Sequence, residues 1–134
     1  MRVVLDTNVF VSGVFFSGPP YEILDAWRRG EVEIVLSLEI LAEYQETAVE
    51  LSHGFPGVDM TPWLEFLTLK ASIIDAPALP EHVCTDPDDD KFLACALASR
   101  TKLIVSGDKA LRRTSGYGGI EVITPRQFVD RHLR

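Results

Sequence analysis

Short apolar runs and longer amphipathic segments follow one another along the chain. Runs rich in branched apolar residues predict strands at 3–5, 32–36, 72–75, 103–106 and 120–123. Segments with helical spacing or helix start signals predict helices at 21–29, 38–51, 61–71, 86–100, 108–113 and 125–133. The apolar segment 9–16 fits either structure. Because strands alternate with helices from end to end, we expect an α/β fold with a mainly parallel sheet.

Residues at the segment ends agree with these boundaries. Pro19 and Pro20 open one helix and Gly30 closes it, which is the usual asymmetry of helix ends. Ser37 is suited to cap the helix that follows. The chain has 134 residues and contains no repeat or linker-like stretch. We therefore expect a single domain spanning residues 1–134.

The remaining composition bears on the compartment. No apolar run is long enough to cross a bilayer, and the N-terminus lacks the basic and apolar regions of a signal peptide. Cys84 and Cys95 form no metal-binding motif, so we expect free thiols. These features predict a cytoplasmic protein that makes no membrane contact.

Acidic residues follow the predicted strands. Asp6 comes directly after the strand 3–5, and Asp108 follows the strand 103–106. Ligands of parallel α/β sheets bind beyond the carboxyl ends of the strands, so these two aspartates are expected to face one crevice. Asp90 and Glu43 lie near the starts of two helices, and they are expected at the same edge.

The run of acids before the helix 86–100 allows two interpretations. Asp86 is suited to cap the helix and Asp89 to act as its capping-box acid, and for both we favour this structural role. Asp90 is less needed for capping and is the better site candidate. Asp88 is left open between the two roles.

The other candidates also have structural alternatives. Asp108 is equally suited to cap a short helix, and Glu43 to be a solvated helix residue. Asp6 is the hardest to explain structurally, because it closes a buried strand. Asn8 and Ser106 are expected either to orient these acids or to stabilise turns.

Clustered carboxylates repel one another unless a cation joins them, and oxygen ligands suit Mg²⁺ or Mn²⁺. Such ions support phosphodiester hydrolysis. The chain carries 13 Lys and Arg against 20 Asp and Glu, a net charge of -7. That balance is unfavourable for nucleic-acid binding. Either the protein does not bind nucleic acid, or its acids gather in a site that metal ions neutralise.

Four motifs in order give the chain a family likeness. They are Asp6-Thr7-Asn8 after the first strand, Glu43-Tyr44 in a helix, the segment DPDDDKFL at 86–93, and Ser106-Gly107-Asp108. Together they resemble the PIN-domain family over nearly the whole chain. The resemblance is strongest to the prokaryotic toxins of toxin–antitoxin pairs, the VapC-like ribonucleases.

This resemblance implies a three-layer α/β/α sandwich with about five strands in the order 3-2-1-4-5. It implies catalytic and metal-binding roles for Asp6, Glu43, Asp90 and Asp108, with one or two Mg²⁺ or Mn²⁺ ions and with Asn8, Ser106 and Asp88 in support. Asp90 is selected over its neighbours because small and apolar helix residues follow it. The implied activity is cleavage of single-stranded RNA. Toxin members of the family also imply a homodimer and a small antitoxin partner.

Lys109, Arg112 and Arg113 follow Asp108 and are candidates to hold the RNA backbone, although a solvated helix face explains them equally well.

Three rival functions follow from the same pattern. A non-catalytic PIN-like module would bind RNA or a protein. A response-regulator-like domain would need a phosphorylatable aspartate, for which only Asp75 is suitably placed, and a proline-containing connection follows it. A flap-type DNA nuclease would need extra DNA-gripping segments, for which this chain has no room.

Overall fold

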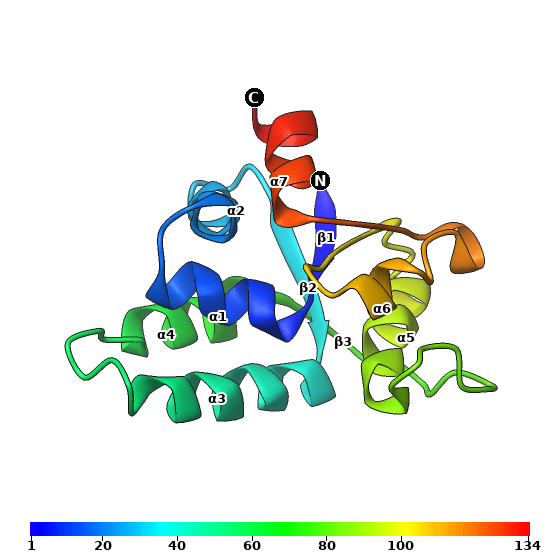
Figure 1. The fold of residues 1–134 in the computed structure, drawn as a ribbon, viewed down its shortest axis with the longest axis horizontal. Coiled ribbons are helices and arrows are strands. Elements are labelled where there is room, and N and C mark those ends of the chain that lie inside the picture. The colour runs from blue at the N-terminus through cyan, green and yellow to red at the C-terminus, as the bar shows by residue number, and fades with distance from the viewer.

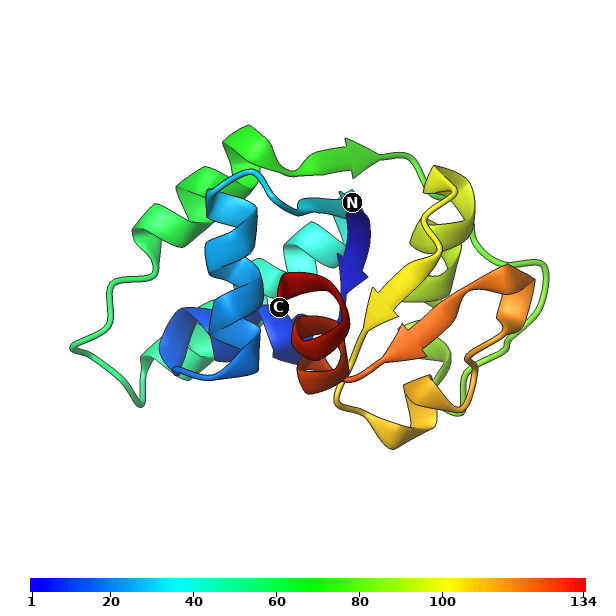
Figure 2. The same ribbon diagram turned by 90° about the horizontal axis from the view of Figure 1, so that it is seen from above.

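The computed structural model describes all 134 residues and contains five strands in one parallel sheet. The strands are β1 (Arg2–Leu5), β2 (Glu33–Ser37), β3 (Ser72–Ile74), β4 (Leu103–Val105) and β5 (Glu121–Ile123). The helices are α1 (Thr7–Phe15), α2 (Pro19–Arg28), α3 (Leu38–Ser52), α4 (Thr61–Lys70), α5 (Asp90–Ser99), α6 (Lys109–Arg112) and α7 (Pro125–Phe128). The strand order is β3-β2-β1-β4-β5, as predicted (Figures 1 and 2).

The first strand lies at the centre of this sheet. Val3 of β1 pairs with Ile34 of β2, and Val4 pairs with Ile104 of β4. Figure 1 shows α1, α2 and α4 on one side of the sheet and α5 on the other. Because both faces are covered, the strand interiors are continuously apolar, and the side chains at 3–5 have no solvent exposure. The predicted three-layer α/β/α architecture is confirmed.

The ambiguous segment at 9–16 belongs to a helix, α1. Its apolar residues occupy several faces, and most of them are buried, so the segment shows neither helical nor strand periodicity. A side chain at Gly13 would place its Cβ 2.7 Å from Leu24 Cδ1 and 2.8 Å from the Pro20 carbonyl oxygen. The absence of a side chain at Gly13 therefore allows α1 and α2 to pack closely.

Two predicted helices are less regular than expected. The segment 86–100 starts with a single 3₁₀ turn, η1 (Pro87–Asp89), before α5 begins at Asp90. The segment 125–133 is α-helical only in α7 and then widens into η3 (Val129–Leu133), whose turns are of the π type. A further 3₁₀ turn, η2 (Tyr117–Gly119), precedes β5.

Two smaller observations complete the fold. None of the helices combines the length and the apolar character that a membrane crossing requires. Cys84 and Cys95 are buried and form no disulfide, so the prediction of free thiols is confirmed.

Candidate active site

Asp6 and Asp108 follow the two central strands, and Ser106 joins them. The Asp6 amide still donates to the Val105 carbonyl of β4 (2.9 Å), so the backbone is held where the side chain leaves the sheet. The buried Ser106 hydroxyl donates to Asp6 Oδ2 (2.7 Å) and accepts from the Asp108 amide (3.0 Å). A single serine thus fixes the Asp6 carboxylate relative to the loop that carries Asp108.

Asp108 also has the structural role considered above. Its Oδ1 accepts a hydrogen bond from the Ala110 amide (3.0 Å) and caps α6. The side chain is nonetheless close enough to Asp6 for their charges to interact. The capping role and the site role are therefore compatible at this position.

Asp6 is 7% exposed, and its charge is unfavourable where it lies. Burial raises the pKa of its carboxyl above the ordinary value, and repulsion from Asp108 and Glu43 raises it further. The hydrogen bond from Ser106 opposes this rise without cancelling it. A buried carboxylate with acidic neighbours is a typical feature of a functional site.

Glu43 reaches this region from α3, whose start is fixed by the predicted cap. The Ser37 hydroxyl accepts from the Ile40 amide (3.3 Å), and Glu43 lies one turn further along the helix. Its Oε1 accepts from the Thr7 hydroxyl, and its Oε2 pairs with the ammonium of Lys91. Glu43 therefore lies near Asp6, but both of its oxygens are already engaged by the protein.

Asp90, the acid that the family resemblance selects, is held by the connection before α5. Its Oδ1 accepts from the Cys84 amide (2.8 Å), and both of its oxygens lie 3.3 Å from the Val83 amide. Its Oδ2 also lies 3.1 Å from Nδ1 of His82. Burial raises the pKa of Asp90, but these hydrogen bonds outweigh burial and lower it overall. Asp90 anchors the connection before α5.

Asp89, the neighbour of Asp90, interacts electrostatically with Asp6 and Asp108. It makes no capping hydrogen bond, so the predicted capping-box role is wrong, whereas Asp86 does accept from the Asp88 amide (3.0 Å) as a cap. The pKa of Asp89 rises to about 6, first because of burial and then because of repulsion from Asp6, Asp86 and Asp108. We call Asp6, Asp89 and Asp108 the acidic edge.

The predicted supporting residues have different surroundings. Asn8 is exposed, and it makes no side-chain hydrogen bond. Asp88 is exposed and pairs with the Lys91 ammonium (3.1 Å). The Lys91 side chain is only 4% exposed, so it is not a solvated surface cation. Its place between two acids was not apparent from the sequence.

The three predicted RNA-binding cations lie on or just after α6, close to Asp108. Lys109 and Arg113 are exposed, Arg112 is half-buried, and none of the three forms an ion pair. Their positive charges are therefore available to a ligand.

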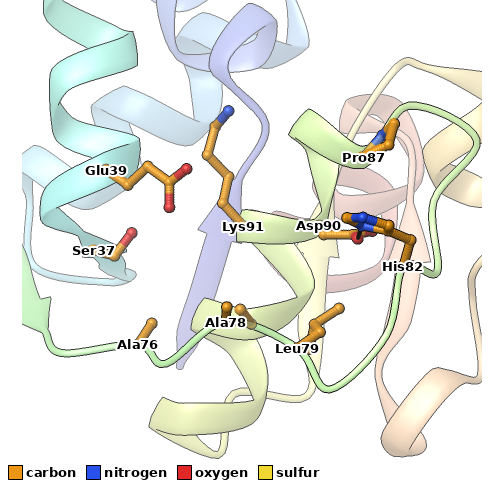
Figure 3. Close-up of a pocket in the computed structure, with 10 residues that line it drawn as sticks. Ser37, Glu39, Ala76, Ala78, Leu79, His82, Pro87, Asp90 and Lys91 are labelled. Carbon is orange, nitrogen blue, oxygen red and sulfur yellow. Dashed lines mark hydrogen bonds and ion pairs between the residues drawn. The ribbon is translucent and has the colours of Figure 1, made fainter.

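A pocket of about 180 Å³ lies beside the acidic edge, between the start of α3, the helix α5 and the connection before it. Figure 3 shows His82 against Asp90 at one side, while the Lys91 side chain runs away from Ala78 and Leu79. The pocket is lined by Asp90 and Lys91 but by none of the acidic-edge residues. It is therefore a neighbouring hollow with its own lining.

The acidic edge has donors that fit a divalent cation. All of its side-chain ligands are carboxylate oxygens, which Mg²⁺ and Mn²⁺ prefer. Asp6 and Asp89 carry raised pKa values that a nearby cation would lower. No group of three or more His, Cys, Asp or Glu side chains is arranged to hold a metal ion in this structure. The fit therefore rests on donor chemistry and mutual repulsion.

Comparison with known proteins identifies the family of this chain. The family profile described as PIN domain matches residues 2–110. An uncharacterized protein of Methanocaldococcus jannaschii, MJ1680, is 32% identical over 143 residues, which cover 97% of this chain and 90% of that protein.

One solved structure shares the fold. It is VapBC2 from Rickettsia felis bound to a DNA fragment from their promoter, with a TM-score of 0.55 and 17% identity over 92% of this chain and 98% of that chain. Because the family profile covers most of the chain, the chain belongs to the PIN-domain family.

Proposed function

We propose that this protein is a divalent-metal-dependent endoribonuclease that hydrolyses phosphodiester bonds of single-stranded RNA, with residues 1–134 acting as a single nuclease domain. The main observation in support is the pair of hydrogen bonds made by the Ser106 hydroxyl, which holds the buried Asp6 beside Asp108. Membership of the PIN-domain family supports a nuclease activity at this edge.

The proposed metal site consists of Asp6, Asp89 and Asp108. This set replaces Asp90, whose oxygens are engaged by backbone amides, with its neighbour. These residues would hold a Mg²⁺ or Mn²⁺ ion, which would supply an activated water and stabilise the negative charge on the phosphate. Ser106 keeps Asp6 oriented, and Glu43 supports the edge through its contact with Thr7.

RNA binding is proposed to begin on α6. The exposed Lys109 and Arg113 lie beside Asp108 and are free to contact phosphates on either side of the scissile bond. They give a local positive surface on a protein of net charge -7. A bound divalent ion offsets part of the remaining repulsion at the acidic edge.

The test is cleavage of a labelled single-stranded RNA with Mg²⁺, with Mn²⁺ and with EDTA, by the wild type and by Asp6→Asn. We expect metal-dependent cleavage that the substitution lowers by more than about 100-fold, because loss of a residue that merely orients a ligand already costs about 10- to 100-fold. The control is Asp130→Asn, which removes an exposed acid from η3.

Asp6→Asn should keep its fold, since it removes a charge whose burial is unfavourable. Circular dichroism checks this directly. Equal cleavage by the wild type and Asp6→Asn would reject the site. Metal binding without cleavage of several RNAs would favour the alternative, a PIN-like module that binds RNA or protein.

We further propose that the protein is the cytoplasmic toxin of a toxin–antitoxin pair and acts as a homodimer. The fold match to a chain of VapBC2 supports this assignment. A small protein encoded beside this one should co-purify with it and abolish cleavage, and unchanged cleavage would reject it as an antitoxin. Sedimentation should give twice the chain mass of 14.9 kDa, and a single chain mass would reject the dimer.

A further inference from the structure

Lys91 is a buried cation inside an acidic region. Lysine side chains are rarely buried unless they are paired, and this one is 4% exposed. Its ammonium contacts Glu43 Oε2, Asp88 Oδ2 (3.1 Å) and the Asp88 carbonyl oxygen (2.8 Å). An ammonium group has three donors, so these acceptors are sufficient to satisfy it. It also lies 5.5 Å from the ring centroid of Phe92.

Glu43 is correspondingly engaged at both of its oxygens. One carboxylate oxygen accepts from Thr7 and the other pairs with Lys91, so the charge of Glu43 is neutralised within the protein. Without the ammonium, Glu43 would be a carboxylate close to Asp6, with one oxygen free for a cation. Figure 3 shows the Lys91 side chain extending from α5 toward the end of β1, where Asp6 follows.

We infer that Lys91 is a positioning residue that occupies the place of a second cation, so that the acidic edge holds one divalent ion and not two. This inference rests on the proposed function and specifies its metal site. The fixed ammonium neutralises Glu43 by direct contact, which leaves the aspartates of the acidic edge to share one ion. The Lys91 ammonium also prevents Glu43 from being a direct ligand of this ion.

The test counts bound ions and needs no activity measurement. Mn²⁺ is titrated into the protein, and free Mn²⁺ is measured by electron paramagnetic resonance. We expect one bound ion per chain in the wild type and two in Lys91→Met, which retains most of the side-chain volume and removes the charge. Lys91→Arg retains the charge and should bind one ion.

Two further variants separate this role from a structural one. Lys102→Met removes an exposed cation at the opposite, amino end of β4 and should still bind one ion. Lys91→Met combined with Glu43→Gln also removes the carboxylate of the extra site and should return the count to one. A purely structural ion pair would change the melting temperature of Lys91→Met and leave the count at one.

Lys91→Leu provides the same charge removal without any group that engages Glu43, in case Lys91→Met does not fold. Two ions in the wild type, or one ion in either folded neutral variant, would overturn the inference while the nuclease proposal stands. A wild type that binds no Mn²⁺ would overturn the proposed metal site itself, and the inference with it.

Discussion

Asp89 and Asp90 are neighbours in the chain, yet they lie in opposite surroundings. Asp89 faces other carboxylates, and its pKa rises to about 6. Asp90 faces the amides of Val83 and Cys84, and its pKa is lowered. The first is an unfavourable charge at the candidate active site, and the second is a favourable charge that fixes a connection. Proximity in sequence therefore says little about the role of an acid in such a run.

The difference has a geometric origin. Successive residues of an α-helix are separated by about 100° around its axis, so two adjacent side chains at a helix start leave in different directions. Asp89 ends η1 and Asp90 begins α5, so helix geometry predicts different directions for their side chains. Substitution of each by asparagine changes little in size, so a matched pair of variants can test the comparison directly.

The largest expected effect is that of Asp89→Asn on cleavage. We expect a loss of more than about 100-fold, because the change removes a proposed metal ligand and not merely a residue that orients one. The rate is measured with labelled RNA at saturating Mn²⁺. The control, Asp90→Asn, should cleave within about tenfold of the wild-type rate. If Asp90→Asn lowers the cleavage rate more than Asp89→Asn does, Asp90 is the site residue.

The same variant should become more stable. The pKa of Asp89 is raised from 3.8 to about 6, so the folded state binds more protons than the unfolded state between these values. Stability from this group is present at low pH and is lost as the pH rises through about 6. In EDTA at pH 7, Asp89→Asn should raise the free energy of unfolding by about 1 to 3 kcal/mol. Urea denaturation at pH 7 and pH 4 tests this, and a gain that persists at pH 4 would contradict it.

Asp90→Asn should have the opposite effect on stability. The lowered pKa of Asp90 means that its contribution is present above the unfolded pKa and is lost as the pH falls through the folded value. We expect the free energy of unfolding at pH 7 to fall by about 1.5 to 3 kcal/mol, the range for hydrogen bonds to a charged group. Urea denaturation at decreasing pH should show the deficit shrinking, and an equal deficit at all pH values would indicate a different cause.

Ser106→Ala should reduce cleavage by about 10- to 100-fold, since it removes the group that orients Asp6. Its free energy of unfolding should fall by about 1.5 to 3 kcal/mol, the range for a hydrogen bond to a charged group. Ser106→Thr retains the hydroxyl and should restore most of the rate in the same RNA assay. If Ser106→Thr folds but does not restore the cleavage rate, the hydroxyl is not the important group.

The smallest expected effect is that of the cations on α6. Lys109→Ala combined with Arg113→Ala should weaken RNA binding severalfold and lower the slope of log K against log salt by about 1.4, or about 0.7 for each lost phosphate contact. Binding is measured in the Asp6→Asn background to prevent cleavage, with Lys102→Ala as the control. An unchanged salt dependence would show that these residues are solvated helix residues that do not contact RNA.

The sequence was sufficient for the sheet but not for the different surroundings of the acids at 86–90. Buried parallel strands are continuously apolar and are followed by helices, so the elements were predictable from local pattern. The order of the strands was predictable from the family resemblance. At 86–90, four acids compete for one helix start, and only tertiary contacts decide which of them caps, anchors or faces Asp6. Lys91 was missed for the same reason, because its partner Glu43 lies on a different helix.

The pairing of β1 with β4 also has a consequence during synthesis. Asp6 is made early, but the serine that orients it and the aspartate beside it come 100 or more residues later. A chain emerging from the ribosome N-terminus first therefore carries an incomplete set of acids until β4 has been translated and has inserted next to β1. On the proposed function, nascent chains of this protein are inactive until that pairing has formed.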